Sequence, residues 1–271
     1  MKYVLISGSC GGMGLATVKK FIDNGYFVFG LDIRNNEYTN DNYLFIKTNL
    51  RDNDSIKNAY DIIKDKTSEL DAIISMAGIY NLDSLIEMSE EEFIKIFDIN
   101  VFSVYRLNKT FVDLLKRKGK VIITSSELAP LYPLPFTGIY AITKKTVEGY
   151  ADSLRMELQL LDKQVSVIRP GAVDTSLLDI SLASMNRFTQ KTSHYKYNSE
   201  KFRDIVNNVE NKKIPPEKIA NLAFKIVNKK KPKYVYKINR NPGLLLLNAM
   251  PKRLQNWTIK KILTSKKRAS I

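Results

Sequence analysis

The chain has 271 residues, 44% of them hydrophobic, which suits one α/β domain with a full core. Twelve glycines and nine prolines exclude a fibrous or low-complexity protein. The net charge of +15 leaves nucleic acid and anionic lipid open as partners, whereas one cysteine and one histidine exclude an internal disulfide and a metal site built from several histidines.

Strand and helix patterns alternate along the first half of the chain. The expected strands are 2–6, 26–31, 43–47 and 71–75, and the expected helices are 13–24, 54–66 and a long helix over 89–118. Ser89 and Glu92 have the spacing of a capping box at the start of that long helix.

In the second half the expected strands are 120–124, 164–168 and 234–238, with a helix over 141–161. This alternation predicts an α/β fold, a Rossmann-type doubly wound parallel sheet of about seven strands with helices on both faces. We expect one dinucleotide-binding domain over 1–240. Within it, the weakly periodic segment 176–216 would be an irregular cover over the ligand crevice. A basic amphipathic extension would follow over 241–271.

A glycine-rich loop follows the first expected strand and opens the first expected helix. It contains Gly8, Gly11, Gly12, Met13 and Gly14. Glycines in this position let the backbone turn sharply and approach a pyrophosphate, which binds at the helix N-terminus. An ordinary strand-to-helix turn is the alternative explanation of the loop by itself.

Asp32 ends the second expected strand, where a carboxylate accepts hydrogen bonds from ribose hydroxyls and repels a 2′-phosphate. The sequence therefore favours NAD over NADP as the cofactor. Arg34 is the counter-argument, because a guanidinium there could reach a phosphate; the simpler expectation is an arginine exposed to solvent.

Tyr140 and Lys144 are four residues apart at the start of an expected helix, so both lie on one face. A nearby ammonium favours the phenolate and would lower the tyrosine pKa, which suits proton exchange with a substrate oxygen. Ser125 and Ser126 end the preceding strand. Asn100 lies inside the long helix, where asparagine is unfavourable unless its amide has another role.

Together and in this order, these motifs resemble the short-chain dehydrogenase/reductase family over residues 2–175. The resemblance implies that Tyr140 exchanges the proton, Lys144 binds the nicotinamide ribose, Ser126 (preferred to Ser125) holds the substrate oxygen, and Asn100 supports a water linking Lys144 to solvent. It also implies a cofactor site made of Gly8, Gly11, Gly12, Met13, Gly14, Asp32, Asn49, Leu50, Ala77, Gly78, Tyr140, Lys144, Pro170, Gly171, Val173 and Thr175. No residue is expected to bind a metal.

Three positions depart from the family pattern. Ser75-Met76 precede Ala77 where the family usually has asparagine, Asn49 replaces an acid near the adenine, and the Ser126–Tyr140 spacing is about one residue longer than usual. At Ala77 the backbone can still meet the cofactor, although one support is lost, and the amide of Asn49 can make a contact similar to that of the acid without the charge.

Residues 211–271 contain 17 Lys or Arg and one acid, Glu217, so this segment carries +16 and the first 210 residues carry −1. Leu247, Met250, Leu254 and Trp257 recur there at helical spacing among basic residues. Such a helix lies on an anionic membrane or packs on the body or on a partner subunit. Membrane contact would favour a lipophilic steroid, retinoid or lipid ketone.

The expected protein is a cytoplasmic, homo-oligomeric alcohol or ketone oxidoreductase, with peripheral contact at the inner membrane face as an option. Relatives in the family are often dimers or tetramers. The alternatives are a catalytically silent dinucleotide-sensing or scaffold protein and, less favoured because the tail lacks a recognition motif, a nucleic-acid-binding protein.

Overall fold

The computed structural model of the chain describes residues 1–210 and 212–265, so Lys266–Arg268 of the basic tail lie outside the described residues. Its centre is a sheet of seven parallel strands in the order β3-β2-β1-β4-β5-β6-β7. The strands are β1 (Lys2–Ser7), β2 (Tyr26–Asp32), β3 (Tyr43–Lys47), β4 (Leu70–Ser75), β5 (Leu115–Thr124), β6 (Gln164–Pro170) and β7 (Val235–Ile238). The predicted seven-stranded α/β fold is confirmed.

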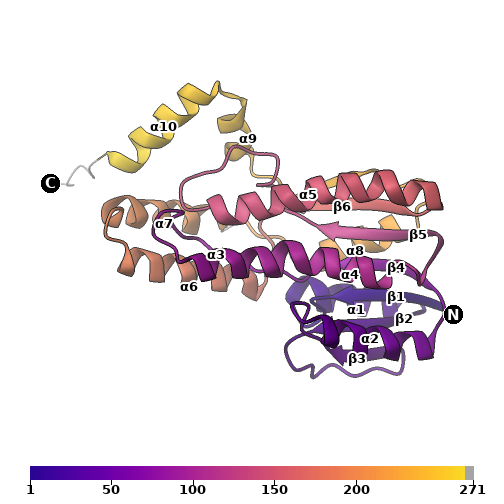
Figure 1. Cartoon of the computed structure of the whole chain (residues 1–271). Helices are drawn as coiled ribbons and strands as arrows, with labels where there is room; N and C mark the ends of the chain where they lie inside the picture. Colours follow the sequence, from indigo (N-terminus) through magenta and orange to yellow (C-terminus); the bar gives the residue numbers. More distant parts are fainter. Residues whose placement is uncertain (211, 266–271) are drawn as a thin grey trace.

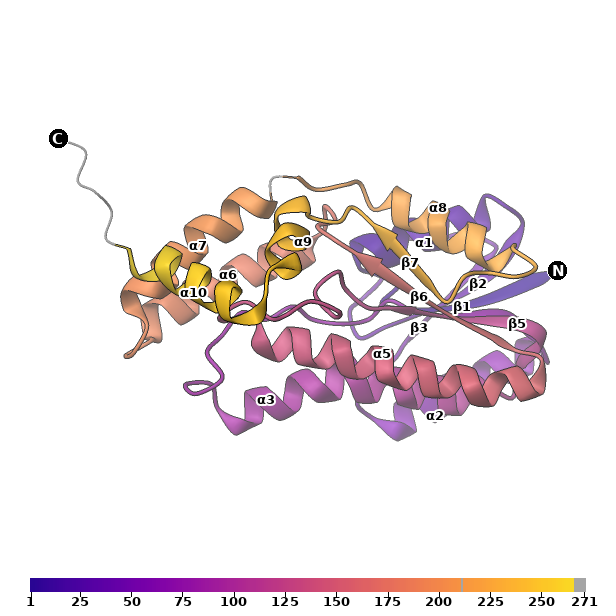
Figure 2. The same ribbon diagram turned by 90° about the horizontal axis from the view of Figure 1, so that it is seen from above.

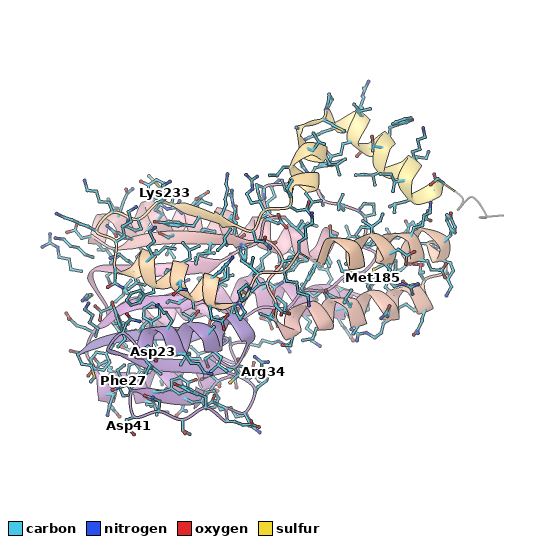
Figure 3. All side chains as sticks on the ribbon, turned by 180° about the vertical axis from the view of Figure 1, so that it is seen from behind. Asp23, Phe27, Arg34, Asp41, Met185 and Lys233 are labelled. Carbon is cyan, nitrogen blue, oxygen red and sulfur yellow. The ribbon has the colours of Figure 1, made fainter. Side chains whose placement is uncertain are left out.

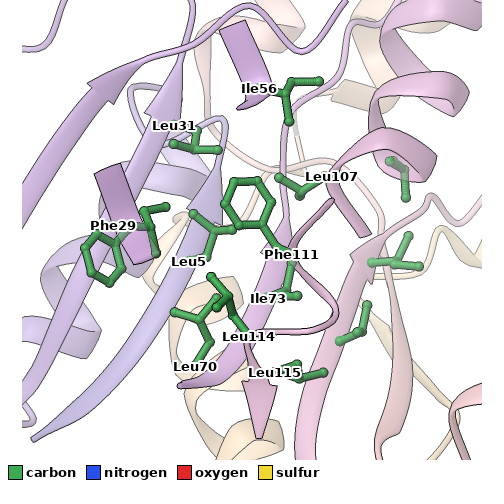
Figure 4. Packing of buried hydrophobic residues seen from close by; sticks show 14 of the residues in the cluster. Leu5, Phe29, Leu31, Ile56, Leu70, Ile73, Leu107, Phe111, Leu114 and Leu115 are labelled. Carbon is green, nitrogen blue, oxygen red and sulfur yellow. The ribbon is translucent and has the colours of Figure 1, made fainter. Parts of the chain in front are cut away.

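Helices cover both faces of the sheet (Figures 1 and 2). One face carries α1 (Gly12–Ile22) and α8 (Glu217–Val227), and the other carries α2 (Asn53–Lys66), α4 (Ser103–Phe111) and α5 (Gly138–Leu158). Figure 4 shows the larger hydrophobic core, in which Leu5, Phe29 and Ile73 of the sheet pack against Leu107 and Phe111 of α4. Because both faces are buried, the strands are apolar runs.

The prediction of one long helix over 89–118 is wrong, because the helix is interrupted in its interior and ends before residue 118. Ser89 caps α3 (Glu90–Phe97) by accepting a hydrogen bond from the Glu92 backbone N–H at 3.2 Å, as the capping box predicts. A π-helical turn (Asp98–Phe102) then leads into α4, which ends at Phe111. Strand β5 begins as early as Leu115, because Leu115 pairs with Leu70 of β4 before a register shift.

The segment expected to be an irregular cover is helical. It forms α6 (Ser176–Lys191) and α7 (Lys196–Glu210), which lie beyond the carboxyl ends of the strands (Figure 1). The C-terminal segment is two helices rather than one, α9 (Pro242–Ala249) and α10 (Lys252–Thr264), because Met250-Pro251 interrupts the helical spacing. No helix in the described part of the chain has the length and apolar composition needed to cross a bilayer.

A third hydrophobic cluster fastens these added helices to the body. Phe136, from the loop before α5, packs against Phe188 of α6, Phe202 of α7 and Leu263 of α10. The Glu87 carboxylate holds the connection between α6 and α7. It accepts hydrogen bonds from the Thr192 hydroxyl and from the backbone N–H of His194. The cover is therefore a packed layer over the sheet edge.

Candidate active site

The glycine loop makes a close backbone turn between β1 and α1. Gly8 has φ +72°, a left-handed conformation that side chains disfavour. A Cβ at Gly14 would lie 1.9 Å from the Gly8 carbonyl oxygen, and a Cβ at Gly12 would lie 2.6 Å from Thr175 Cγ2. Only glycine fits at these positions, and the first turn of α1 carries no acid, so its free N–H groups remain available to an anion.

Asp32 is buried at the end of β2, and its carboxylate is saturated with hydrogen bonds. It accepts the backbone N–H groups of Cys10 and Arg34, each at 3.0 Å, and the Arg34 Nε and Nη2 groups, each at 3.1 Å. Burial opposes the charged form, but the hydrogen bonds from Arg34 and Cys10 outweigh it and lower the pKa of Asp32. Arg34 is exposed to solvent, as expected, and in addition its guanidinium pairs with Asp32.

A cleft joins the glycine loop to the ends of β2, β3 and β4. Its walls include the backbone-rich positions predicted for a dinucleotide: Gly8, Gly11, Gly12, Met13, Gly14, Asp32, Asn49, Leu50, Ala77, Gly78 and Thr175. The glycine loop and the free N-terminus of α1 fit the pyrophosphate of an adenine dinucleotide, and the Asp32 carboxylate fits its ribose. Pro170, Gly171 and Val173 line a second cleft, which shares Met13, Gly78 and Thr175 with the first.

Tyr140 and Lys144, both on α5, line the second cleft beside Ser126, which follows β5. The Ser126 hydroxyl adjoins the Tyr140 phenol and favours its ionised form. The Lys144 Nζ lies 5.7 Å from the centre of the Tyr140 ring and donates a hydrogen bond to the Thr124 carbonyl oxygen at 3.1 Å. The structure therefore brings these three predicted residues together at the carboxyl edge of the sheet.

Burial dominates the protonation of this pair. It raises the pKa of Tyr140 to about 12 against the opposing effect of the Ser126 hydroxyl, and it lowers the pKa of Lys144 to about 8 against the favourable charge of Glu148. The pKa of Tyr140 shifts in the direction opposite to the one expected from the sequence. The free-energy cost of removing the phenolate from water exceeds the stabilisation that its neighbours provide. A cation bound in the same pocket would favour the phenolate.

Asn100 is fully buried in the π-helical turn and bonds to protein groups on both sides. Its Oδ1 accepts the Ile79 N–H at 2.8 Å, and its Nδ2 donates to the Ile79 carbonyl oxygen at 2.9 Å and to the Thr143 hydroxyl at 3.1 Å. Asn100 thus ties the chain after Gly78 to α5, one residue before Lys144. These bonds fix the cleft wall, which accounts for an asparagine inside a helical segment.

Ser125 borders the reaction cleft, but its hydroxyl is bonded away from the cleft. Its hydroxyl donates to Glu148 Oε1 at 2.7 Å, and Glu148 also pairs with the guanidinium of Arg169 at the end of β6. Sequence reasoning missed Glu148; its position one turn after Lys144 on the same helix face was the available signal. Because Ser125 is used in this network, Ser126 is the serine that meets Tyr140.

Apart from these polar groups, the wall of the reaction cleft is largely apolar and comes from segments far apart in the chain. It consists of Tyr80, Leu128, Leu134, Leu177, Phe202, Ile205, Val206 and Leu244. The Tyr80 ring packs against the Tyr140 ring, with centroids 4.3 Å apart and the planes tilted by 45°. Most of these residues were not predicted, because their convergence depends on how α6, α7 and α9 fold over the sheet edge.

Comparisons with known proteins agree with this arrangement. The family model of the short chain dehydrogenases matches residues 2–185. A 3-ketodihydrosphingosine reductase of Bacteroides thetaiotaomicron is 24% identical over 238 residues, which is 87% of each chain. An NADPH-dependent 1-acyldihydroxyacetone phosphate reductase of Schizosaccharomyces pombe is 29% identical over 203 residues, covering 72% of this chain and 69% of that protein.

Among solved structures, a short chain dehydrogenase family protein from Francisella tularensis superimposes with a TM-score of 0.73 at 24% identity, covering 88% of this chain and 97% of the other. The family model spans well over half of the chain in sequence. The chain therefore belongs to the short-chain dehydrogenase/reductase family, oxidoreductases that act on alcohol and ketone groups with a nicotinamide dinucleotide.

Proposed function

We propose that this oxidoreductase interconverts a secondary alcohol and a ketone on a lipophilic substrate, with Tyr140 as the group that exchanges the proton. The observation that carries the proposal is the placement of the Ser126 and Tyr140 hydroxyls in one cleft, with the Lys144 ammonium beside them, at the polar end of otherwise apolar walls. A carbonyl oxygen placed between the two hydroxyls would be polarised, while the rest of the substrate contacts apolar walls.

Each side chain has a defined part in this scheme. Ser126 orients the substrate oxygen, and Tyr140 donates a proton to it during reduction or accepts one during oxidation. Lys144 places a positive charge near the phenol and would bind the nicotinamide ribose; its Nζ and the Asn100 Oδ1 both lie within 3.5 Å of the Cβ position of Gly78. The dinucleotide, when bound along the glycine loop, supplies or accepts the hydride.

The substrate class follows from the apolar wall. Leu134, Phe202, Ile205 and Leu244 offer no hydrogen bond to a ligand, so they favour an aliphatic or polycyclic body over a sugar or a hydroxy acid. Two relatives are named as reductases of ketones that carry long-chain or acyl groups, 3-ketodihydrosphingosine and 1-acyldihydroxyacetone phosphate. Both observations support a lipid-like, steroid-like or retinoid-like ketone.

NAD is the cofactor we propose, because the Asp32 carboxylate stays charged and would repel a 2′-phosphate. The paired Arg34 is the competing feature, and two relatives are NADPH-dependent by name. Asp32 must exchange its Arg34 side-chain bonds for ribose hydroxyls when NAD binds, since its two oxygens already accept four hydrogen bonds.

A homo-oligomer is part of the proposal. The outer surfaces of the π-helical turn, α4 and α5 expose Phe102, Tyr105, Ile142 and Met156. These helices lie next to each other along one side of the molecule, so their apolar side chains favour a face shared with a second copy (Figure 1). Tyr105→Glu would shift the sedimentation coefficient of the protein toward that of a monomer if this face is used.

The direct test is a screen of ketones and alcohols by the absorbance of reduced nicotinamide, run with both dinucleotides in parallel. We expect turnover on long-chain or polycyclic ketones and little turnover on small sugars. A chain that binds a dinucleotide but turns over no member of a broad panel would instead be a sensing or scaffold protein, and the proposal would be wrong.

A further inference from the structure

The outer face of α10 combines apolar and cationic side chains that no part of the described chain covers. Trp257 is 57% exposed and Leu254 is 47% exposed, and both lie on the side of the helix that carries Arg253 and Lys261. On the preceding helix, Leu246 is 68% exposed. A large aromatic ring and leucines held in water among basic residues are unfavourable unless a partner covers them.

The opposite face of α10 is fixed to the body, so the direction of the outer face is determined. Gln255 and Leu263 are buried, and Ile259 packs in the third hydrophobic cluster. The Asn198 side chain of α7 donates to the Leu263 carbonyl oxygen at 2.9 Å. The helix therefore presents Trp257 and Leu254 outward as a rigid surface.

The charge of this region identifies the partner. The segment 241–265 contains four Lys or Arg and no acid, and the sequence of the tail beyond it adds Lys266, Lys267 and Arg268. A symmetric contact between two copies would bring two such segments together, and like charges repel. An anionic lipid surface instead supplies opposite charge for the lysines and an apolar layer for tryptophan and leucine.

We propose that α9 and α10 form a docking surface for an anionic lipid bilayer, with Leu246, Leu254 and Trp257 inserted among the acyl chains and Arg253, Lys260 and Lys261 against the headgroups. A single tryptophan at the lipid boundary is a favourable anchor, because its ring is apolar and its N–H is polar. Lys261 lies 4.8 Å from the centre of the Trp257 ring, so the cation and the anchor act at one place.

The docked surface would also bring lipid to the reaction cleft. A groove beside α10 is lined by Leu85, Ile86, Tyr132, Ile259 and Leu263. Leu134 lines both this groove and the cleft that holds Tyr140, so the two are neighbours. This passage from bilayer to cleft rests on the proposed function; the docking itself does not.

The tryptophan fluorescence of the full chain reports on this surface alone, since Trp257 is the only tryptophan in the sequence. Vesicles of phosphatidylcholine mixed with phosphatidylglycerol should shift its emission to the blue and sediment the protein, and vesicles of phosphatidylcholine alone should do neither at physiological salt. The K260Q/K261Q variant should lose roughly thirtyfold in vesicle affinity, because each cation near an anionic surface contributes about 1 kcal/mol.

The matched control removes the same charge from the same basic segment at the far end of the molecule. Lys229 and Lys230 lie in the exposed loop before β7, which also holds Lys233; Figure 3 shows this residue at the opposite end from α10. K229Q/K230Q should bind vesicles nearly as well as the unaltered protein. Leu254→Ser should weaken vesicle binding while it leaves the folded stability and the Trp257 probe in place.

Three results would overturn the proposal: equal loss in both double variants, a blue shift that depends on protein concentration without vesicles, or tighter salt-sensitive binding to duplex DNA than to the vesicles. The first would mean non-specific charge, the second a second copy of the chain, and the third a nucleic acid. Vesicle binding is read without turnover, so failure of the docking surface and failure of the proposed reaction are distinguishable. Turnover of a water-soluble ketone should be the same in K260Q/K261Q and the unaltered protein.

Discussion

The Glu148 carboxylate forms a largely buried ion pair with the Arg169 guanidinium, and this pair joins the helix that carries Tyr140 and Lys144 to the strand that ends at Pro170. Glu148 is also the negative charge that favours protonated Lys144, and it holds the Ser125 hydroxyl beside Ser126. One side chain therefore supports both the geometry and the charge of the reaction cleft without touching a substrate.

Glu148→Gln should lower the pKa of Lys144 further below its value of about 8, because burial then acts without a compensating charge. Protonated Lys144 is the active form in our scheme, so the fall in activity with rising pH should begin at lower pH. Folding stability should drop by about 2 kcal/mol, between the values for exposed and buried pairs. The measurements are the pH profile of kcat/KM and urea unfolding.

Arg169→Gln is the matched control for this substitution. It breaks the same ion pair and should cost similar stability, but it leaves the Glu148 charge in place. Its pH profile should therefore keep the position seen in the unaltered protein. Identical profiles for the two variants and the unaltered protein would remove Glu148 from any role beyond packing.

The Asp32–Arg34 pair should decide which dinucleotide is used. Asp32→Asn removes the repulsion of a 2′-phosphate and should raise the NADP/NAD ratio of kcat/KM by at least about tenfold, equivalent to about 1.4 kcal/mol. Arg34→Gln frees the carboxylate from the side-chain ion pair and should leave NAD affinity equal or higher. If Arg34→Gln instead abolishes the use of a preferred NADP, our assignment of NAD is wrong.

The glycine loop should tolerate no side chain at Gly14. In Gly14→Ala the new Cβ would meet the Gly8 carbonyl oxygen, so we expect a loss of about 1–3 kcal/mol of stability and of dinucleotide affinity. Gly149 on α5 has nothing near its Cβ position in one chain, so Gly149→Ala, made in the Tyr105→Glu background that removes the proposed shared face, should raise stability by up to about 1 kcal/mol. Thermal unfolding and fluorescence titration with NADH measure both effects; equal behaviour of the two variants would contradict the crowded-turn explanation.

Local periodicity predicted most of the sheet and the glycine loop because buried parallel strands are continuous apolar runs that a turn or helix interrupts. It failed where a tertiary contact overrides the local pattern. The local pattern predicts a helix at Leu115, but Leu115 pairs with Leu70 in the sheet. Residues 176–210 form helices whose apolar sides are defined only by their packing in the cluster around Phe136. The helix α8, also unpredicted, is stabilised by packing on α1.

The candidate site was predicted where spacing along one helix or strand end determines proximity, as for Tyr140, Lys144 and Ser126. The Glu148–Arg169 pair and the apolar wall from Leu128 to Leu244 were missed because their members meet only after the chain has folded. The pKa of Tyr140 was expected in the wrong direction because a sequence shows neighbouring charges but not the depth of burial.

The account depends most on proton exchange at the Tyr140 hydroxyl, which Tyr140→Phe removes while it keeps the ring against Tyr80. With a ketone accepted by the unaltered protein, we predict that single-turnover oxidation of NADH slows by about a thousandfold. Fluorescence titration should show nearly unchanged NADH binding, and Tyr132→Phe, outside the reaction cleft, should behave as the unaltered protein. Turnover of Tyr140→Phe within a few fold of the unaltered rate would contradict the central claim.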